Sequence, residues 1–526
     1  MSQMPYSAAP AHVGVRQGFP ALRVFGIVLV WFACTAWLRP LSLPDEGRYV
    51  GVAWEMLRSG NWVVPTLDGM PFLHKPPLFY WITAFALHLF GPHEWAARCA
   101  SMGAAALTVA VVYSSVREWF DERAARTVAV VLATQPLFFG GAQFANLDML
   151  VAACITISIL LGARAALRYE RGENCRNELI GLYVAMGCGL LSKGLIGIVI
   201  PVAVLTAWLG AVGHWRSLRI LCWAPGAAIF GVMVLPWLVA VQSVHGEFLH
   251  YFFVVQHFQR FAGTGFNGVQ PLWFYGPVLL VLTLPWSAWL FMRWRADGHA
   301  RAKRPSIVSL MWLWLLGVVV FFSVPQSKLI GYVLPALAPL AVLVGTAIAP
   351  AAARAGKVLR LWRVSLALAA LLCVGAAAAF ALLDPKSSRG LAQQLAALRA
   401  QGEGVAFLDH YSYDLPFYLG DNPPIMVVSN WDPVDVRSHD NWRKELADAG
   451  SFAPELASQR LVDDAQFTAS LCAGRIRWVV GKPDQIPTHA FLRAAPVVAA
   501  QGAFVLWHAD IADPHFRAAL ACAAPR

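Results

Sequence analysis

The chain has 526 residues, of which 58% are hydrophobic and only 13% are charged. A soluble domain is typically about 45–50% apolar and about 25% charged, so a single water-soluble core cannot accommodate this composition. The formal net charge of +11 comes without a run of Lys and Arg residues or a basic patch rich in aromatics, which excludes a nucleic acid as the expected partner. The composition therefore predicts a protein that crosses a membrane several times.

Apolar stretches long enough to cross a bilayer recur along the first part of the chain. The sequence predicts about eleven spans, of which the third to fifth are short, so one of them could be a broken or re-entrant helix. They lie near residues 21–39, 95–116, 127–143, 147–163, 177–191, 194–213, 220–241, 272–292, 306–323, 329–350 and 364–383. Residues 1–20 contain no cleavable apolar stretch, so we expect the first span to be retained as an anchor.

The charge of the loops predicts the orientation of these spans. If the N-terminus is cytoplasmic, the loops on the cytoplasmic side are rich in basic residues, for example Arg164, Arg168 and Arg171. This pattern follows the positive-inside rule and favours an odd number of spans. Two long segments, residues 40–94 and 243–270, would then lie on the opposite side, where long ordered loops commonly carry function.

An odd number of spans divides the chain into a transmembrane domain, residues 1–383, and a domain on the far side of the membrane, residues 384–526. The second domain alternates strand-like runs with helix-like pieces, which predicts a small α/β domain. The strand-like runs are Val405–Leu408, Ile425–Val428, Ile476–Val480 and Phe504–Trp507, and Gly390–Ala400 is a helix-like piece. Its two cysteines, Cys472 and Cys522, would either form a disulfide in an oxidising compartment or remain free thiols.

Three acidic residues are candidates for chemistry. Asp45 and Glu46 open an amphipathic run in the first long segment, where they could either begin a helix or hold carboxylates over a substrate. Asp148 lies at the start of an apolar run, and an acid at membrane depth is a functional candidate, although it could also serve as a helix cap. We assign all three to a catalytic group.

Seven basic residues are predicted on the side of the membrane where the positive-inside rule disfavours them, and four of these are candidates for binding a phosphate: Lys75, Lys193, Arg260 and Lys328. Lys75 precedes Pro76 and Pro77 and is therefore presented on a stiff segment. Each could be an interfacial anchor, but together they could surround one lipid phosphate. We predict a shared phosphate site.

The sequence predicts neither a metal nor a cofactor. His245, His250 and His257 lack the spacing of a metal-binding motif. There is also no Walker loop and no glycine-rich dinucleotide fingerprint. Energy for chemistry on the far side of the membrane would then have to arrive attached to a lipid.

Several motifs, in this order, resemble those of the bacterial lipid A aminoarabinose transferases, which belong with the protein O-mannosyltransferases to the GT-C group of membrane glycosyltransferases. The motifs are Asp45–Tyr49, Gly60–Pro65, Lys75–Leu78, Leu147–Leu150, Ser192–Gly194, His257–Arg260, Gln270-Pro271, Pro285-Trp286 and Ser327-Lys328. The resemblance covers roughly residues 20–345.

The resemblance implies an all-α GT-C bundle with a soluble periplasmic domain, in the bacterial inner membrane. It also implies transfer of a sugar from an undecaprenyl-phosphate donor, with lipid A as the first-guess acceptor. Asp45 and Asp148 match the family's acids, and Lys75, Lys193 and Arg260 match its basic positions. Relatives often have Glu where this chain has His74. We assign Arg48, Tyr49, His257 and Tyr332 to substrate binding.

Two mechanisms and two rival functions remain open. A phosphate acceptor is already anionic, so Asp45 would orient it or balance an amino sugar, whereas a hydroxyl acceptor would need Asp45 as general base. The first rival is a protein O-glycosyltransferase or O-mannosyltransferase. The second is a transporter or flippase of lipid-linked sugars, but the sequence shows no clear inverted repeat.

Overall fold

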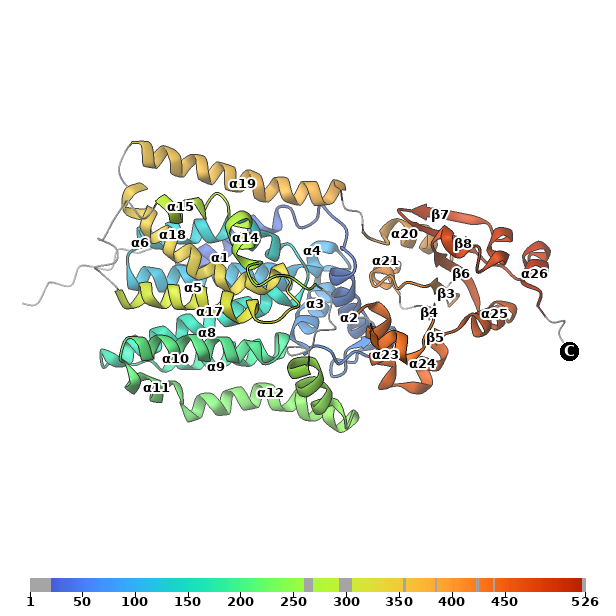
Figure 1. Cartoon of the computed structure of the whole chain (residues 1–526), viewed down its shortest axis with the longest axis horizontal. Coiled ribbons are helices and arrows are strands. Elements are labelled where there is room, and N and C mark those ends of the chain that lie inside the picture. The colour runs from blue at the N-terminus through green and yellow to red at the C-terminus, as the bar shows by residue number, and fades with distance from the viewer. Residues whose placement is uncertain are drawn as a thin grey trace, which may run out of the picture.

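The computed structural model describes residues 20–259, 268–292, 305–352, 356–383, 386–400, 402–421, 423, 425–438 and 440–522. It consists of a bundle of long helices and a smaller unit built around a β-sheet (Figure 1). Three helices of the first long segment lie between the bundle and the sheet: α2 (Asp45–Ser59), α3 (Leu78–Phe90) and α4 (Glu94–Ala97). We call the sheet-containing part, from residue 386 onward, the C-terminal unit.

Six helices in the described part of the chain are long and apolar enough to cross a membrane, so this is a multi-pass membrane protein. They are α5 (Cys99–Trp119), α8 (Leu147–Glu170), α12 (Ala224–Val244), α17 (Pro305–Ser323), the continuous pair η3 (Ile330–Ala336) and α18 (Leu337–Ala352), and α19 (Lys357–Leu383). Shorter apolar helices are α1 (Ala21–Ala33), α3 and α10 (Ile196–Ala211).

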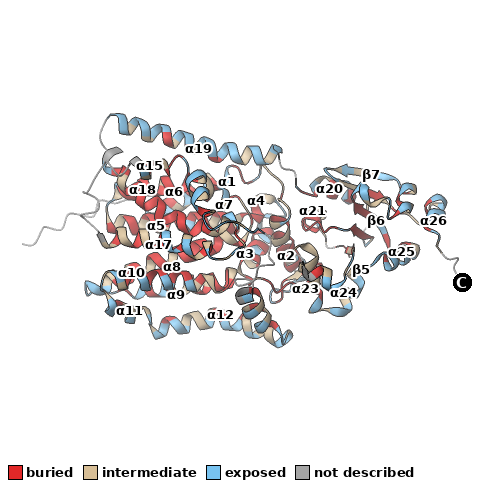
Figure 2. Cartoon of the chain, in the orientation of Figure 1, coloured by how far each residue is buried: buried red, intermediate tan, exposed pale blue. Residues whose placement is uncertain are grey.

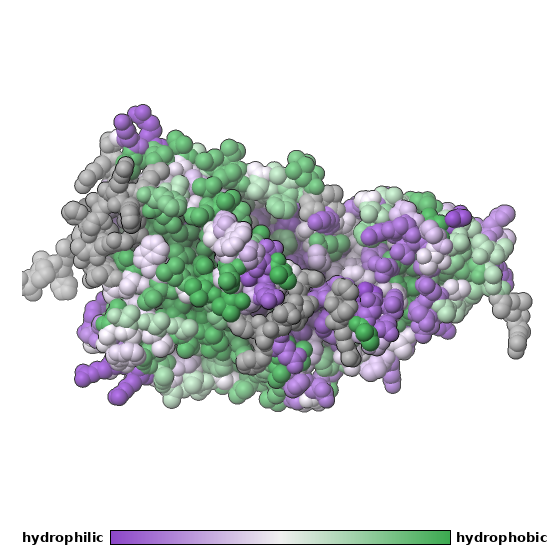
Figure 3. Space-filling model, in the orientation of Figure 1, coloured by the Kyte–Doolittle hydropathy of each residue, from purple (hydrophilic) through white to green (hydrophobic). Residues whose placement is uncertain are grey.

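The outer helices of the bundle expose apolar side chains. Helices α5, α8 and α18 are mostly buried, whereas α12 and α19 lie at the periphery and are mostly exposed (Figure 2). The exposed side chains include Val232 and Val239 of α12 and Leu371 and Phe380 of α19. Apolar residues cover the middle of the visible face of the bundle, and hydrophilic residues gather on the C-terminal unit (Figure 3). Such a surface suits the hydrocarbon of a bilayer rather than water.

Most predicted spans correspond to helices, but some are broken. The predicted span 127–143 is divided into α6 (Glu122–Ala133) and α7 (Pro136–Ala142). Pro136 causes the break, because proline disfavours the helical conformation in the residue before it and Gln135 is extended, with ψ 122°. The predicted span 272–292 is likewise divided, into α14 (Tyr275–Leu282) and α15 (Ala288–Met292). The break between α6 and α7 falls in the third predicted span, so the broken helix expected among the third to fifth spans is confirmed.

The remaining elements of the bundle complete this arrangement. The first long segment contains the short hairpin of β1 (Thr66–Leu67) and β2 (Met70–Pro71), and the second contains the π-helix η1 (His250–Gln259). The other helices are α9 (Arg176–Lys193) and α11 (Trp215–Leu221). Helix α19 runs along the bundle and ends beside the C-terminal unit (Figure 1).

The C-terminal unit contains a six-stranded sheet of order β5-β4-β3-β6-β8-β7. Strands β5, β4, β3 and β6 are parallel, and β8 and β7 are antiparallel to their neighbours. The strands are β3 (Gly404–Leu408), β4 (Ile425–Val428), β5 (Leu461–Val462), β6 (Ile476–Gly481), β7 (Val497–Gln501) and β8 (Phe504–His508). The helices are α20 (Arg389–Leu398), α21 (Leu415–Leu419), α22 (Pro433–Ser438), α23 (Trp442–Ser451), α24 (Pro454–Arg460), α25 (Asp464–Cys472) and α26 (Pro514–Leu520).

The four strands expected from the sequence are confirmed as β3, β4, β6 and β8. Every residue of β3 is buried, as is typical of a central parallel strand covered on both faces. Strand β5 was missed because it has only two residues, and β7 because it lies at the sheet edge and is only partly buried.

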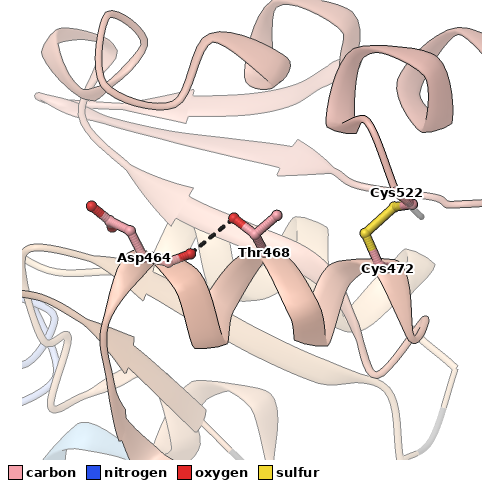
Figure 4. Close-up of a disulfide and its surroundings, with 4 residues drawn as sticks. All are labelled: Asp464, Thr468, Cys472 and Cys522. Atoms are coloured by element: carbon pink, nitrogen blue, oxygen red, sulfur yellow. Dashed lines mark hydrogen bonds between the residues drawn. A yellow bond between two sulfur atoms is a disulfide. The ribbon is translucent and has the colours of Figure 1, made fainter.

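A disulfide joins Cys472, at the end of α25, to Cys522, just after α26 (Figure 4). Thr468, one turn before Cys472, donates a hydrogen bond from its hydroxyl to the backbone oxygen of Asp464 at 2.8 Å. The first of the two alternatives for these cysteines is therefore confirmed. The crosslink encloses 50 residues and would stabilise the unit by about 4 kcal/mol if it acts only by restricting the unfolded chain.

Candidate active site between the bundle and the C-terminal unit

Helix α2 begins with the first candidate acid, Asp45, whose side chain is 40% exposed. An acid in the first turn of a helix is stabilised by the partial positive charge of the helix N-terminus. Arg48, one turn later, donates from Nη2 to Asp45 Oδ1 at 2.5 Å. The guanidinium of Arg48 also lies 4.8 Å from the centre of the Tyr49 ring. Asp45 thus keeps access to solvent while its orientation is fixed by Arg48.

Glu46, the next residue, is fully buried and its oxygens are bonded on all sides. Arg98 donates to both carboxylate oxygens, at 2.9 and 3.1 Å, and Arg39 makes a further ion pair. The backbone N–H groups of Ser42 and Ala145 add hydrogen bonds of 3.0 and 2.8 Å. Although burial alone would raise it, the two arginines lower the pKa of Glu46 to about 2.

These contacts leave the Glu46 carboxylate no access to a substrate. They instead join α2 to the segment that follows α1, to the residue before α5 and to the segment before α8. The structure therefore favours a structural role for Glu46 over the expected catalytic one, because the side chain is enclosed and saturated with donors.

The second candidate acid, Asp148, forms an ion pair with Lys193. Asp148 stands in the first turn of α8, and Lys193 is the last residue of α9. The helix cap is supplied by Asn146, whose side-chain oxygen accepts a 3.0 Å hydrogen bond from the backbone N–H of Asp148. The carboxylate of Asp148 is therefore not needed as the cap and is available to Lys193.

Two residues of η3, Gly331 and Tyr332, lie against the Asp148–Lys193 pair. The Lys193 ammonium lies 4.5 Å from the centre of the Tyr332 ring, a distance at which a cation is attracted to the face of an aromatic ring. Gly331 lies so close to Asp148 that a Cβ atom there would be 2.4 Å from the carboxylate oxygen Oδ2. Any larger residue at this point would force the Asp148 carboxylate to move.

Tyr49 connects the two acid–base pairs. Burial raises the pKa of Tyr49 to about 12, and the charges of Arg48, Asp45, Lys193 and Asp148 all act on its hydroxyl. Direct contacts within each group and electrostatic effects between the groups therefore connect six of the predicted site residues, from α2, α8, α9 and η3. They are Asp45, Arg48, Tyr49, Asp148, Lys193 and Tyr332.

The remaining predicted site residues, Lys75, Lys328, Arg260 and His257, are not among these six. Lys75 is half-buried in the turn between β2 and α3. The buried Lys328 donates to the backbone oxygen of Gln270 at 2.8 Å, so its ammonium is bound to a neighbouring loop, and the structure favours a structural role over the expected phosphate contact. Arg260 and the side chain of His257 lie outside the described residues.

The sequence analysis did not identify two residues that contact this site. Glu445 and Tyr413, both in the C-terminal unit, lie against Arg48: Glu445 forms an ion pair with Arg48, and the Tyr413 hydroxyl donates to the second oxygen of Glu445 at 2.6 Å. Glu445 lies 397 residues from Arg48, and no local pattern signals such a pairing.

The solved structure of ArnT from Cupriavidus metallidurans bound to undecaprenyl phosphate matches 93% of this chain and 97% of its own, with a TM-score of 0.78 and 24% sequence identity. The apo structure of the same protein gives a TM-score of 0.76. The fold is that of ArnT. This agreement extends over both the bundle and the C-terminal unit.

Sequence comparisons agree with the expected resemblance. Residues 74–239, which include Lys75, Asp148 and Lys193, match the family described as dolichyl-phosphate-mannose-protein mannosyltransferase. The undecaprenyl phosphate-alpha-4-amino-4-deoxy-L-arabinose arabinosyl transferase of Pseudomonas paraeruginosa is 35% identical over 323 residues, 59% of this chain and 57% of that protein. The enzyme of the same name from Erwinia tasmaniensis is 33% identical over 311 residues, 58% of this chain and 55% of that protein. The matches thus span little more than half the length of these curated relatives.

Proposed function

We propose that this protein is an inner-membrane glycosyltransferase that moves 4-amino-4-deoxy-L-arabinose from undecaprenyl phosphate to lipid A. The observation that carries the proposal is that the charges of the Asp45–Arg48 and Asp148–Lys193 pairs both act on the Tyr49 hydroxyl. The relatives named for this transfer, and the ArnT structure with bound undecaprenyl phosphate, support the choice of donor.

In the proposed reaction, the bond between the anomeric carbon of the sugar and an oxygen of the donor phosphate breaks. The electron pair stays on undecaprenyl phosphate, and a phosphate oxygen of lipid A forms the new bond to the anomeric carbon. Lys193 and Lys75, with Arg260 as a further candidate, would stabilise the charge that develops on the leaving phosphate. Asp148 would hold the Lys193 ammonium in place for this task.

We propose that Asp45 interacts with the transferred sugar or with the acceptor. A lipid A phosphate is anionic and needs no strong base, so Asp45 would orient the acceptor or balance the ammonium of the aminoarabinose. Arg48 and Tyr49, beside Asp45, and Tyr332, beside Lys193, would contact the substrates. His257 remains a candidate for substrate binding.

The proposed topology places the N-terminus in the cytoplasm and the predicted domain of residues 384–526, which includes the C-terminal unit, in the periplasm. About eleven spans over residues 1–383 would give this arrangement. The disulfide between Cys472 and Cys522 supports it, because structural disulfides persist in oxidising compartments such as the periplasm. The segments 40–94 and 243–270 would also be periplasmic.

The test is mass spectrometry of lipid A from cells that contain the chain and from cells that lack it. We expect the mass of one aminoarabinosyl group on lipid A only with the intact chain, and its loss in Asp45→Asn. Unmodified lipid A together with newly glycosylated periplasmic proteins would refute the lipid A assignment. It would favour a protein O-glycosyltransferase instead, in keeping with the description of the matching family.

A further inference from the structure

The C-terminal unit contacts Arg48 of the candidate active site through Glu445 of α23. The Glu445 carboxylate forms an ion pair with Arg48, and each of these side chains is only 15% exposed. The second oxygen of Glu445 accepts the 2.6 Å hydrogen bond from Tyr413, in the segment between β3 and α21. Glu445 is therefore fixed on its own side of the junction before it meets Arg48.

The backbone of α2 is shaped to allow this approach. Gly47 and Gly51 are four residues apart, so they lie on the same face of the helix. A Cβ atom at Gly51 would be 2.7 Å from the backbone oxygen of Tyr413, and one at Gly47 would be 3.1 Å from the backbone nitrogen of Asp414. The segment that carries Tyr413 therefore packs directly on the helix that carries Arg48.

Arg48 is shared between two carboxylates from different parts of the molecule. One of its terminal nitrogens bonds Glu445 and the other bonds Asp45. Charge-assisted hydrogen bonds to a planar guanidinium fix its direction as well as its position. If Glu445 were uncharged, Arg48 would be held mainly by Asp45. Arg48 would then no longer be fixed by a second carboxylate, and it could not hold Asp45 in one orientation toward a substrate.

We propose that Glu445, supported by Tyr413, is a positioning residue that acts through Arg48 to hold Asp45 in its productive orientation. The C-terminal unit would then contribute to sugar transfer rather than only cover the bundle. This inference rests on the proposed function. It assigns to Glu445 no contact with the substrates.

The first experiment measures transfer kinetics of the purified full chain with undecaprenyl-phosphate aminoarabinose and lipid A. We expect Glu445→Gln to lower kcat about tenfold while the KM for the donor changes by less than about twofold. Glu445→Asp should recover part of the rate because it restores the charge. Glu455→Gln is the matched control, since Glu455 is an exposed acid on the neighbouring helix α24.

A double-variant cycle separates positioning from a general structural role. In an Arg48→Gln background, Glu445→Gln should change kcat by less than about twofold, because its effect passes through Arg48. A further tenfold loss in that background, or an unchanged kcat in the single variant, would overturn the proposal.

Hydrogen exchange of the substrate-free protein gives a readout that does not depend on transfer. We expect Glu445→Gln to speed amide exchange severalfold in the first turns of α2, with no change at α8. Exchange in α2 equal to that of the parent would overturn the proposal even if the chain proved to transfer another sugar. Absence of transfer by the parent would instead refute the proposed function, and the exchange data would still decide the role of Glu445.

Discussion

The adjacent acids Asp45 and Glu46 should respond in opposite ways to the same change. Glu46 is fully buried between two arginines and two backbone N–H groups. Glu46→Gln would leave Arg39 and Arg98 without their charged partner, and removing one member of a buried ion pair typically costs about 3–5 kcal/mol. Asp45 is 40% exposed, so Asp45→Asn should cost less than about 1 kcal/mol.

The assay is thermal unfolding of the purified chain in detergent, followed in parallel with sugar transfer. We expect Glu46→Gln to lower the melting temperature by about 3–5 °C, because the entropy of unfolding grows with the length of the chain. Asp45→Asn should melt near the parent and lose transfer. A Glu46→Gln variant that melts like the parent but loses transfer would refute the structural role and restore a catalytic one.

Three further outcomes follow from the same contacts. Gly331→Ala should lower kcat at least tenfold, because the added Cβ would be 2.4 Å from Asp148 Oδ2. The control Gly103→Ala, whose Cβ would have nothing within 4 Å, should transfer at the parental rate. Equal rates for the two variants in steady-state assays would contradict the close approach of Gly331 to Asp148. Since the pKa of Glu46 falls from 4.5 to about 2 on folding, its stabilising contribution is present above about pH 4.5 and is lost toward pH 2. The difference in melting temperature between the parent and Glu46→Gln should therefore narrow over that range, and a constant difference would count against the ion pair. Cys472→Ser should destabilise the C-terminal unit by about 4 kcal/mol, measured as earlier proteolysis on heating, and unchanged proteolysis would show that the disulfide contributes little.

Local sequence carried enough information to single out Asp45 and Asp148 as candidate acids. Asp45 opens an amphipathic run and Asp148 opens an apolar one, and both positions follow from helix periodicity and from the cost of an acid at membrane depth. Lys193 was found because it is a cation on the side that the positive-inside rule disfavours. Their arrangement in space depends on the packing of α2, α8 and α9, which no single segment encodes.

The role of Glu46 could not be read from the sequence for the same reason. Its partner Arg98 lies 52 residues away, and an Asp-Glu pair at a helix start looks alike whether one acid is buried or both are exposed. The same pairing would explain a basic residue on the predicted periplasmic side, since the charge of Arg98 is neutralised by Glu46. The ion pair of Arg48 with Glu445 joins the two parts of the molecule across 397 residues, so only the folded arrangement shows it.

The central claim is that the Asp45–Arg48 and Asp148–Lys193 pairs transfer aminoarabinose between two lipids. The most direct measurement uses the purified chain in vesicles that contain undecaprenyl-phosphate aminoarabinose and lipid A, and follows both products. The account predicts equal amounts of aminoarabinosyl lipid A and released undecaprenyl phosphate, with both lost in Asp45→Asn and in Lys193→Ala. Transfer at the parental rate by either variant, or no product from the parent, would contradict it.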